Sequence, residues 1–249
     1  DWGYGGAAQA AVTRRMCAEH GRRPLAFVLT TGDNFYRPDG VATEDNYGVP
    51  ERCLREAGVP WRAAWGNHDE AGDSTATVLG APRRYTFAAG PLRVVVLDSN
   101  RPDDPAQRRF LRDALAAARE PVRVVAFHHP AYTAGANPPG EVQRRDWVPL
   151  FRRHGVALVL QGHNHAYERM EVDGVTYITT GGGGAPVYPC VRPSPGLRTC
   201  LPEHHFLLVE ARRDGLSVRA VTPGGRVLER VGVPARTAAA GGTATTPRP

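Results

Sequence analysis

The order of hydrophobic and polar positions predicts helices and strands in alternation over roughly the first two thirds of the chain, and strands alone after that. Helices are predicted at 9–20, 45–56, 106–118 and 147–153. Strands are predicted at 25–30, 61–65, 85–87, 92–97, 122–127 and 156–160, and then at 175–180, 206–211, 216–221 and 227–231. A βα-repeating part followed by a β-rich part predicts a layered α/β fold, with two packed sheets and helices outside.

The length of the chain favours one domain with a full hydrophobic core. We expect that domain to span 1–236, because residues 237–249 are rich in Ala, Gly, Thr and Pro and predict a flexible tail. Hydrophobic residues make up 41% of the chain and charged residues 22%, which is typical of a soluble globular protein. No apolar run approaches the roughly 20 residues of a transmembrane helix, so no membrane span is predicted.

The charge of the chain bears on its partners. A formal net charge of +6 favours anionic ligands such as small phosphate esters, although a mildly basic surface explains it equally well. No Arg-rich stripe is interleaved with aromatic residues, so nucleic acid is not predicted as a partner. Nothing in the sequence indicates an oligomeric state.

Four cysteines are present, without the Cys-x-x-Cys spacing of a zinc site. Cys190 and Cys200 flank a loop rich in Pro and Gly, which favours a local disulfide. Cys17 and Cys53 lie in segments predicted to be helical and are candidates for a second bridge across space. Buried free thiols explain the four residues equally well. Disulfides would favour an oxidising compartment.

The sequence opens directly on Asp1-Trp2-Gly3, with no apolar run ahead of it. No signal peptide or other targeting segment precedes these residues in the sequence. We expect a processed chain or a piece of a longer one, from which the first strand of the fold is missing.

Side chains able to bind a metal follow four of the predicted strands, each just past the end of its strand. These are Asp33, Asn67, His128 and His163. Asp33 and Asn67 alone are most simply explained as caps of turns, whereas the alternation of His163 and His165 could direct their two rings to two different metals. Ligands of open α/β sheets bind at the carboxyl ends of strands, and a mixture of carboxylate, amide, phenol and imidazole groups suits Fe, Zn or Mn. The absence of thiolates from the set argues against a structural zinc site.

Five motifs occur in the order found in one enzyme family. They are Asp1-Trp2-Gly3, Gly32-Asp33-Asn34-Phe35-Tyr36, Gly66-Asn67-His68-Asp69, Val125-Ala126-Phe127-His128 and Gly162-His163-Asn164-His165. In these motifs the chain resembles the purple acid phosphatases of the calcineurin-like metallophosphoesterase superfamily. The resemblance covers about residues 1–165. It implies an α/β/β/α sandwich of two mixed sheets flanked by helices.

The resemblance also implies two metal ions with unequal ligand sets. An Fe(III) site would be held by Asp1, Asp33, Tyr36 and His165, and an Fe(II), Zn or Mn site by Asp33, Asn67, His128 and His163. Asp33 would bridge the ions. Tyr36 is the reason to expect ferric iron, because a phenolate on Fe(III) gives purple phosphatases their colour.

The implied reaction is hydrolysis of phosphate monoesters, with a metal-bound hydroxide attacking phosphorus. His68 would contact the phosphate or protonate the leaving oxygen, and Asp69 would orient His68. Family members carry another His about ten residues after the ligand that corresponds to His128. Here that region contains Asn137, which puts acid-optimum protonation of the leaving group in doubt. His129 is nearby, but the neighbour of a ligand in an extended segment usually points away.

Two other functions remain open on the sequence. A phosphodiesterase acting on nucleotides or lipid head groups would use the same metals, since the loops between strands set substrate access. A non-catalytic module that binds metal or phosphate is a third reading, against which the intact His68 argues. The family resemblance and the cysteines together imply an extracytoplasmic or secreted protein.

Overall fold

The structure, a computed structural model, describes residues 1–238. Most of the predicted tail 237–249, from residue 239 onward, lies outside the described residues, so the flexible tail stays a prediction. The largest sheet has seven strands in the order β3-β4-β5-β6-β8-β7-β9. Their bounds are β3 Tyr85–Ala89, β4 Leu92–Val96, β5 Val122–Ala126, β6 Val156–Gln161, β7 Tyr167–Val172, β8 Val175–Thr180 and β9 Leu197–Leu201. β4, β5, β6 and β8 are parallel neighbours and the other pairings are antiparallel, so the sheet is mixed.

A second layer of strands faces one side of this sheet and consists of two smaller sheets. One is a parallel pair of β1 Val28–Thr30 and β2 Trp61–Ala63. The other is antiparallel, in the order β10-β11-β12, with bounds Phe206–Arg212, Gly215–Val221 and Val227–Pro234. The second of the two predicted sheets is therefore divided between β1 and β10.

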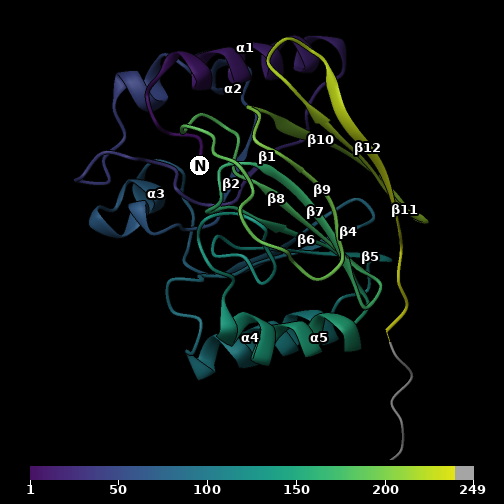
Figure 1. The fold of residues 1–249 in the computed structure, drawn as a ribbon. Helices are drawn as coiled ribbons and strands as arrows, with labels where there is room; N and C mark the ends of the chain where they lie inside the picture. The colour runs from purple at the N-terminus through teal and green to yellow at the C-terminus, as the bar shows by residue number, and fades with distance from the viewer. Residues whose placement is uncertain (239–249) are drawn as a thin grey trace, which may run out of the picture.

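Helices cover both outer faces, as Figure 1 shows with α1 and α2 above the sheets and α4 and α5 below them. The α-helices are α1 Ala7–Arg22, α2 Arg52–Glu56, α3 Ser74–Thr77, α4 Pro105–Ala116 and α5 Val148–Arg153. Single helical turns span Glu44–Gly48, His68–Ala71 and Gln143–Trp147.

Apolar clusters join the layers. Leu111 of α4 and Phe151 of α5 belong to one buried cluster with Val125 of β5. Burying side chains of this size contributes roughly 1.5–3 kcal/mol each, so this cluster fixes α4 and α5 to the sheet. The layers run helix, sheet, sheet, helix, and the predicted α/β/β/α sandwich is confirmed.

The opposite face of the seven-stranded sheet packs on the smaller sheets. Val124 of β5 shares a buried cluster with Val218 of β11. On the outer side, Val12 of α1 is buried with Phe206 of β10. Strands β5 and β6 are therefore covered on both faces, which explains their continuous apolar sequences.

Most sequence-based element bounds are close to the observed ones, and the following differences have a local cause. The helix predicted at 106–118 begins one residue earlier, because Asp104 caps it through Ala106 N at 2.8 Å and Pro105 suits the first turn. The helix predicted at 45–56 is split into a single turn and α2. Strand β7 was not predicted, because Glu168, Arg169 and Glu171 interrupt its apolar residues, and the short strand β9 was not predicted either.

Both expected disulfides are present, and the described residues contain no free cysteine. Cys17–Cys53 ties α1 to α2, and Cys190–Cys200 closes the loop before β9. Among residues 1–238, no helix combines the length and the apolar character needed to cross a membrane.

Candidate metal centre

The predicted site residues converge where strands of the two layers end. Asp33 follows β1, Asn67 follows β2, His128 follows β5 and His163 follows β6. The layers meet there, since His128 Nδ1 lies 2.9 Å from Thr31 O. Asp1 reaches the same place from the N-terminus, which Figure 1 marks near β1 and β2. Its buried amino group donates to Gly32 O at 2.5 Å, and burial lowers the pKa of that group to about 6.

Asp33 occupies the middle of the site in a left-handed backbone conformation, with φ of 51°. Its Oδ1 accepts from His68 N at 2.9 Å, and its Oδ2 lies 3.3 Å from His128 Nε2. A Cβ at Gly66 would lie 2.2 Å from Asp33 Oδ1. Only glycine at position 66 lets the loop after β2 approach the carboxylate this closely.

Asp1, Tyr36 and His165 form the first group of donor atoms. The Tyr36 hydroxyl lies 3.1 Å from Asp1 Oδ1 and 2.9 Å from His165 Nε2, and the latter two atoms are 3.4 Å apart. Ligands at about 2.1 Å from one ion and at right angles are separated by about 3.0 Å. These spacings suit three ligands of one ion.

Asn67, His128 and His163 form the second group. His128 Nε2 lies 3.1 Å from Asn67 Oδ1 and 3.2 Å from His163 Nδ1. Acceptor atoms of Asp1, Asp33 and His128 also lie within 4.8 Å of one another. Asp33 therefore stands between the two groups.

The chemistry of the donors fits cations. Thr31 O can only accept, so His128 Nδ1 carries a hydrogen and Nε2 is the ring nitrogen that faces Asp33 and Asn67. Pro186 O likewise accepts from His165 Nδ1 at 2.8 Å, which leaves Nε2 as the acceptor facing the site. The oxygen and nitrogen atoms of the two groups point their lone pairs toward one another, with too few N–H or O–H hydrogens to bridge them. The lone pairs therefore repel each other, and a bound cation removes that repulsion.

Ionisation of the site residues also suits metal binding. Burial alone would raise the pKa of Asp33, but His128 and the Asp1 ammonium outweigh burial and lower it, so the carboxylate is ionised. Burial and the neighbouring His128 lower the pKa of His163 to about 3, which keeps this imidazole neutral. Burial and the charge of Asp33 raise the pKa of Tyr36, so a phenolate there needs a cation beside it.

His68 and Asp69 are placed differently from each other. The exposed His68 ring lies against Tyr36, with ring centroids 4.3 Å apart. The buried Asp69 accepts from Gly66 N at 2.7 Å and from Asn34 N and Nδ2 at 2.9 Å each. Asp69 therefore holds the loops after β1 and β2 together, and the structure does not show it orienting the His68 ring as predicted.

Three residues of the site were missed or underrated by the sequence reasoning. His129 does not point away, because its ring centroid is 4.5 Å from that of His163. Ser99 fixes it there, since Ser99 Oγ accepts from His129 N at 2.8 Å and lies 3.0 Å from His129 Nδ1. Asn100 donates to Gly66 O at 3.1 Å. The signal for Ser99 and Asn100 was their position just after a predicted strand, which the other site residues share.

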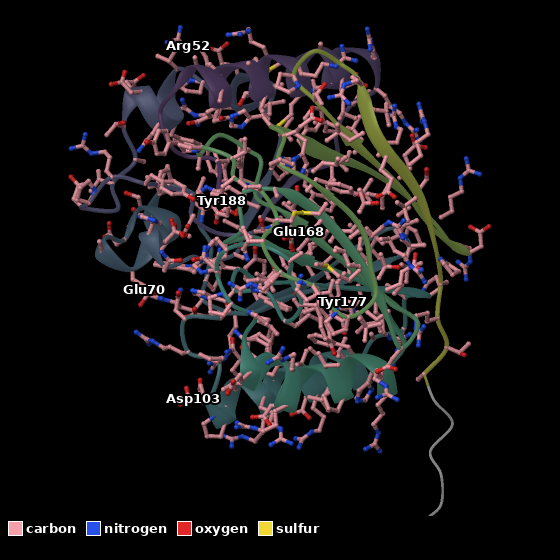
Figure 2. The ribbon with its side chains drawn as sticks, in the orientation of Figure 1. Arg52, Glu70, Asp103, Glu168, Tyr177 and Tyr188 are labelled. Atoms are coloured by element: carbon pink, nitrogen blue, oxygen red, sulfur yellow. A yellow bond between two sulfur atoms is a disulfide. The ribbon has the colours of Figure 1, made fainter. Side chains whose placement is uncertain are left out.

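The side chains of Asn137 and Tyr188 both hydrogen-bond to the backbone carbonyl of His163. The Tyr188 hydroxyl donates to His163 O at 2.9 Å, and Asn137 Nδ2 donates to the same oxygen at 3.1 Å. The Tyr188 ring lies 4.9 Å from the His165 ring. Figure 2 labels Tyr188 and, near it, Glu168 beside a disulfide, where Cys200 Sγ is 4.0 Å from Glu168 Oε1. Asn137 is thus engaged with a ligand segment rather than directed at a leaving group.

Two solved structures with the same fold are of proteins whose role or enzyme class is described. GAP50, described as the anchor in the inner membrane complex of Plasmodium, superposes with a TM-score of 0.81 at 18% identity, over 94% of this chain and 86% of that one. The purple acid phosphatase PPD1 of yellow lupin gives 0.76 at 17% identity, over 91% of this chain and 49% of that one. At these identities the similarity shows a shared fold.

Sequence relatives include named phosphatases. Human tartrate-resistant acid phosphatase type 5 is 28% identical over 200 residues, which cover 63% of this chain and 61% of the human protein. Purple acid phosphatase 17 of Arabidopsis thaliana is 23% identical over 224 residues, which cover 74% of this chain and 66% of that protein. The chain spans less than two thirds of the length of the human relative.

The family profile described as calcineurin-like phosphoesterase matches residues 1–167, which hold all five motifs. These matches confirm the resemblance to purple acid phosphatases. Since the profile covers more than half of the chain, the protein belongs to the calcineurin-like phosphoesterase family.

Proposed function

We propose that this protein is a two-metal hydrolase of phosphate monoesters. The supporting observation is the pair of adjacent donor groups with Asp33 between them, 3.3 Å from His128 and grouped with Asp1. A carboxylate placed between two groups of lone pairs is suited to bridge two cations.

The two ions would be held by the residues that the motifs predict. The first set is Asp1, Asp33, Tyr36 and His165, and the second is Asp33, Asn67, His128 and His163. Two cations supply binding of phosphoryl oxygens and a lowered pKa of water. Tyr36 favours Fe(III) in the first set, and the mixed oxygen and nitrogen donors of the second suit Fe(II), Zn or Mn.

The other polar residues of the site would handle the substrate. Asn67 and His68 are exposed whereas His128 is buried, so an ester reaches the site from the side of His68. From there the His68 imidazole would donate a proton to the leaving oxygen. Burial and His128 lower the pKa of His129 to about 4, so the neutral ring is available as a hydrogen-bond partner for the ester.

The reaction is tested with two esters, p-nitrophenyl phosphate and bis-p-nitrophenyl phosphate, before and after chelation. We expect metal-dependent release of nitrophenol with the monoester as the better substrate. Faster turnover of the diester would identify a phosphodiesterase with the same centre. If the metal-loaded protein hydrolyses neither ester, the remaining reading is a non-catalytic module that binds metal. The fold does not distinguish an enzyme from such a module, since GAP50, described as an anchor, has the same fold.

Iron is tested separately by metal analysis with a visible spectrum. Wild-type protein should carry iron and show a long-wavelength band, which Tyr36→Phe should abolish while metal remains bound. Binding of two equivalents of Mn and no Fe by the wild type would refute the ferric assignment but leave the two-metal centre standing.

We also propose an extracytoplasmic location. The disulfides Cys17–Cys53 and Cys190–Cys200 support it, because such bridges persist in oxidising compartments. Fractionation of cells that produce the protein, with thiol labelling of each fraction, tests this. A fully reduced protein in the cytosolic fraction would contradict the assignment.

A further inference from the structure

Glu168 of β7 is a fully buried carboxyl that lies three residues after the predicted ligand His165. Its Oε2 and Oε1 accept from Thr133 Oγ1 at 2.8 and 3.1 Å, and Oε1 also accepts from Ala134 N at 3.2 Å. These donors belong to the loop that follows β5. A buried carboxyl is costly to keep, so the groups that it binds indicate what it contributes.

The hydroxyl group of Thr133 is fully used, and its partners fix its direction. Gly135 N at 2.9 Å and Asn164 Nδ2 at 2.8 Å both donate to Thr133 Oγ1. These N–H groups can only donate, so they occupy the two lone pairs of the hydroxyl, and its one hydrogen is directed to Glu168. Without an acceptor at position 168, that hydrogen would be left unpaired or would displace one of the two N–H donors.

The side-chain amide of Asn164 is held in one orientation. Its Nδ2 donates to Asn137 O at 3.1 Å, and its Oδ1 accepts from Asn137 N at 2.9 Å. Because a backbone carbonyl only accepts and a backbone N–H only donates, the amide cannot be turned over without loss of both bonds. The two loops also touch closely, since a Cβ at Gly135 would lie 2.3 Å from Asn164 Cγ. Directional hydrogen bonds therefore join the loop after β5 to the loop after β6.

Asn164 lies in the chain between two predicted ligands, His163 and His165. The His163 backbone has a φ of 69°, a left-handed conformation that residues other than glycine rarely adopt without local support. Asn137 Nδ2 supplies such support, because it donates to His163 O at 3.1 Å. The Asn164 side chain is fully buried in the network, whereas ring nitrogens of both neighbours face the proposed metal centre. A fixed Asn164 therefore fixes the direction of both imidazoles.

We propose that Glu168 is a positioning residue for the metal centre and acts on the ligand segment 163–165 through Thr133. This inference rests on the two-metal function proposed above. His163 belongs to one proposed ligand set and His165 to the other, so loss of the Glu168 acceptor weakens the binding of both ions together. Loss of a ligand that belongs to one set alone weakens one of them.

The test compares variants of two buried Thr–Glu pairs. Thr133→Val removes the hydroxyl and keeps the shape, Thr133→Ser restores the hydroxyl, and Glu168→Leu removes the acceptor. The matched control is Thr13→Val, because Thr13 Oγ1 donates to the buried Glu51 at 2.8 Å, outside this network. Protein reconstituted with iron and zinc is titrated with a chelator, and elemental analysis follows the loss of each metal. Amide hydrogen exchange of residues 162–166 and the thermal midpoint are measured in EDTA, so these readouts are independent of metal.

Thr133→Val and Glu168→Leu should each weaken the binding of both metals by about tenfold, as changes behind a metal ligand commonly do. Each should also speed amide exchange over 162–166 by about tenfold in EDTA. The double variant should bind no more weakly than either single variant, because the two side chains share one hydrogen bond. Thr133→Ser should restore the wild-type affinity, and Thr13→Val should lower the thermal midpoint without either effect.

Unchanged metal affinity in Thr133→Val, the same loss of affinity in Thr13→Val, or additive losses in the double variant would overturn the proposal. If Glu168→Leu does not fold, the two Thr133 variants decide the question. A wild type that binds no metal would refute the two-metal centre and this inference with it. A wild type that binds two ions no more tightly than Thr133→Val does would refute the positioning role alone.

Discussion

Glu51 offers the prediction with the best-defined magnitude. Its side chain is 1% exposed, its Oε1 accepts from Thr13 at 2.8 Å and from Gln9 at 3.1 Å, and its Oε2 has no partner among the described residues. Burial raises the pKa of the carboxyl from 4.5 to about 7, and the two hydrogen bonds offset only part of that effect. Replacement of Glu51 by Gln keeps the shape of the side chain and removes its titration.

The direction of the stability change follows from the proton affinity of Glu51 in the folded and in the unfolded protein. The folded protein binds the Glu51 proton more tightly than the unfolded chain does, so the group imposes no penalty below pH 4.5. The penalty grows as the pH rises and is complete above about pH 7. At about 1.4 kcal/mol per pKa unit, the interval from 4.5 to about 7 corresponds to about 3 kcal/mol. Glu51→Gln should therefore equal the wild type at pH 4 and exceed its stability by up to about 3 kcal/mol at pH 8.

Urea unfolding of both proteins in EDTA, followed by circular dichroism from pH 4 to pH 8, measures this difference. Other titrating groups cancel in the difference between wild type and variant. The thermal midpoint at pH 8 should rise by about 6–12 °C for a domain of this size. A stability difference that does not change with pH, or a variant less stable than wild type at pH 8, would show that Glu51 is ionised at no cost in the folded state.

Three further predictions concern the metal centre and the disulfides. Asn67→Ala should lower the bound metal from two equivalents to one, whereas Asp33→Asn should lower the occupancy of both metal sites, as measured by elemental analysis. Equal losses of metal in the two variants would argue against a bridging Asp33. Tyr188→Phe removes the donor to His163 O, worth about 1 kcal/mol, and should weaken metal binding about fivefold in a chelator competition, with Tyr132→Phe as the unaffected control. The Cys17→Ser, Cys53→Ser variant opens a closed loop with a sequence separation of 36 and should lose about 4 kcal/mol in urea unfolding; an unchanged midpoint would contradict this.

The part of the fold and site that the sequence predicts well is the part with local signals. Buried parallel strands such as β5 and β6 are continuous apolar runs, and the residues just past their ends converge because parallel strands end at one edge of a sheet. Strand β9 was missed because it is an edge strand of only 5 residues that follows an irregular loop. Its one neighbour, β7, pairs with it across a long sequence separation, which no local pattern encodes.

The same distinction applies to single residues. His128 was predicted from its motif, whereas Tyr188 reaches His163 from a loop whose course depends on the Cys190–Cys200 bridge and on β9. The role predicted for Asp69 rests on its sequence adjacency to His68 and stays a prediction. In the structure the helical turn that begins at His68 directs Asp69 into the protein, where backbone N–H groups bind it.

Asp33 and His163 share a feature with a consequence for ion selectivity. Both adopt positive φ angles, 51° and 69°, at a cost of about 1–2 kcal/mol each for residues other than glycine. Hydrogen bonds within the protein offset that cost, since His163 N donates to Asp1 Oδ2 at 2.9 Å and His68 N donates to Asp33 Oδ1 at 2.9 Å. If Asp33 and His163 hold the proposed ions, a backbone held in this way would resist expansion around a large cation and contraction around a small one. Ionic radius, in addition to affinity, would then limit which metals can occupy the proposed centre, and ions of similar radius would exchange without a change in the loops.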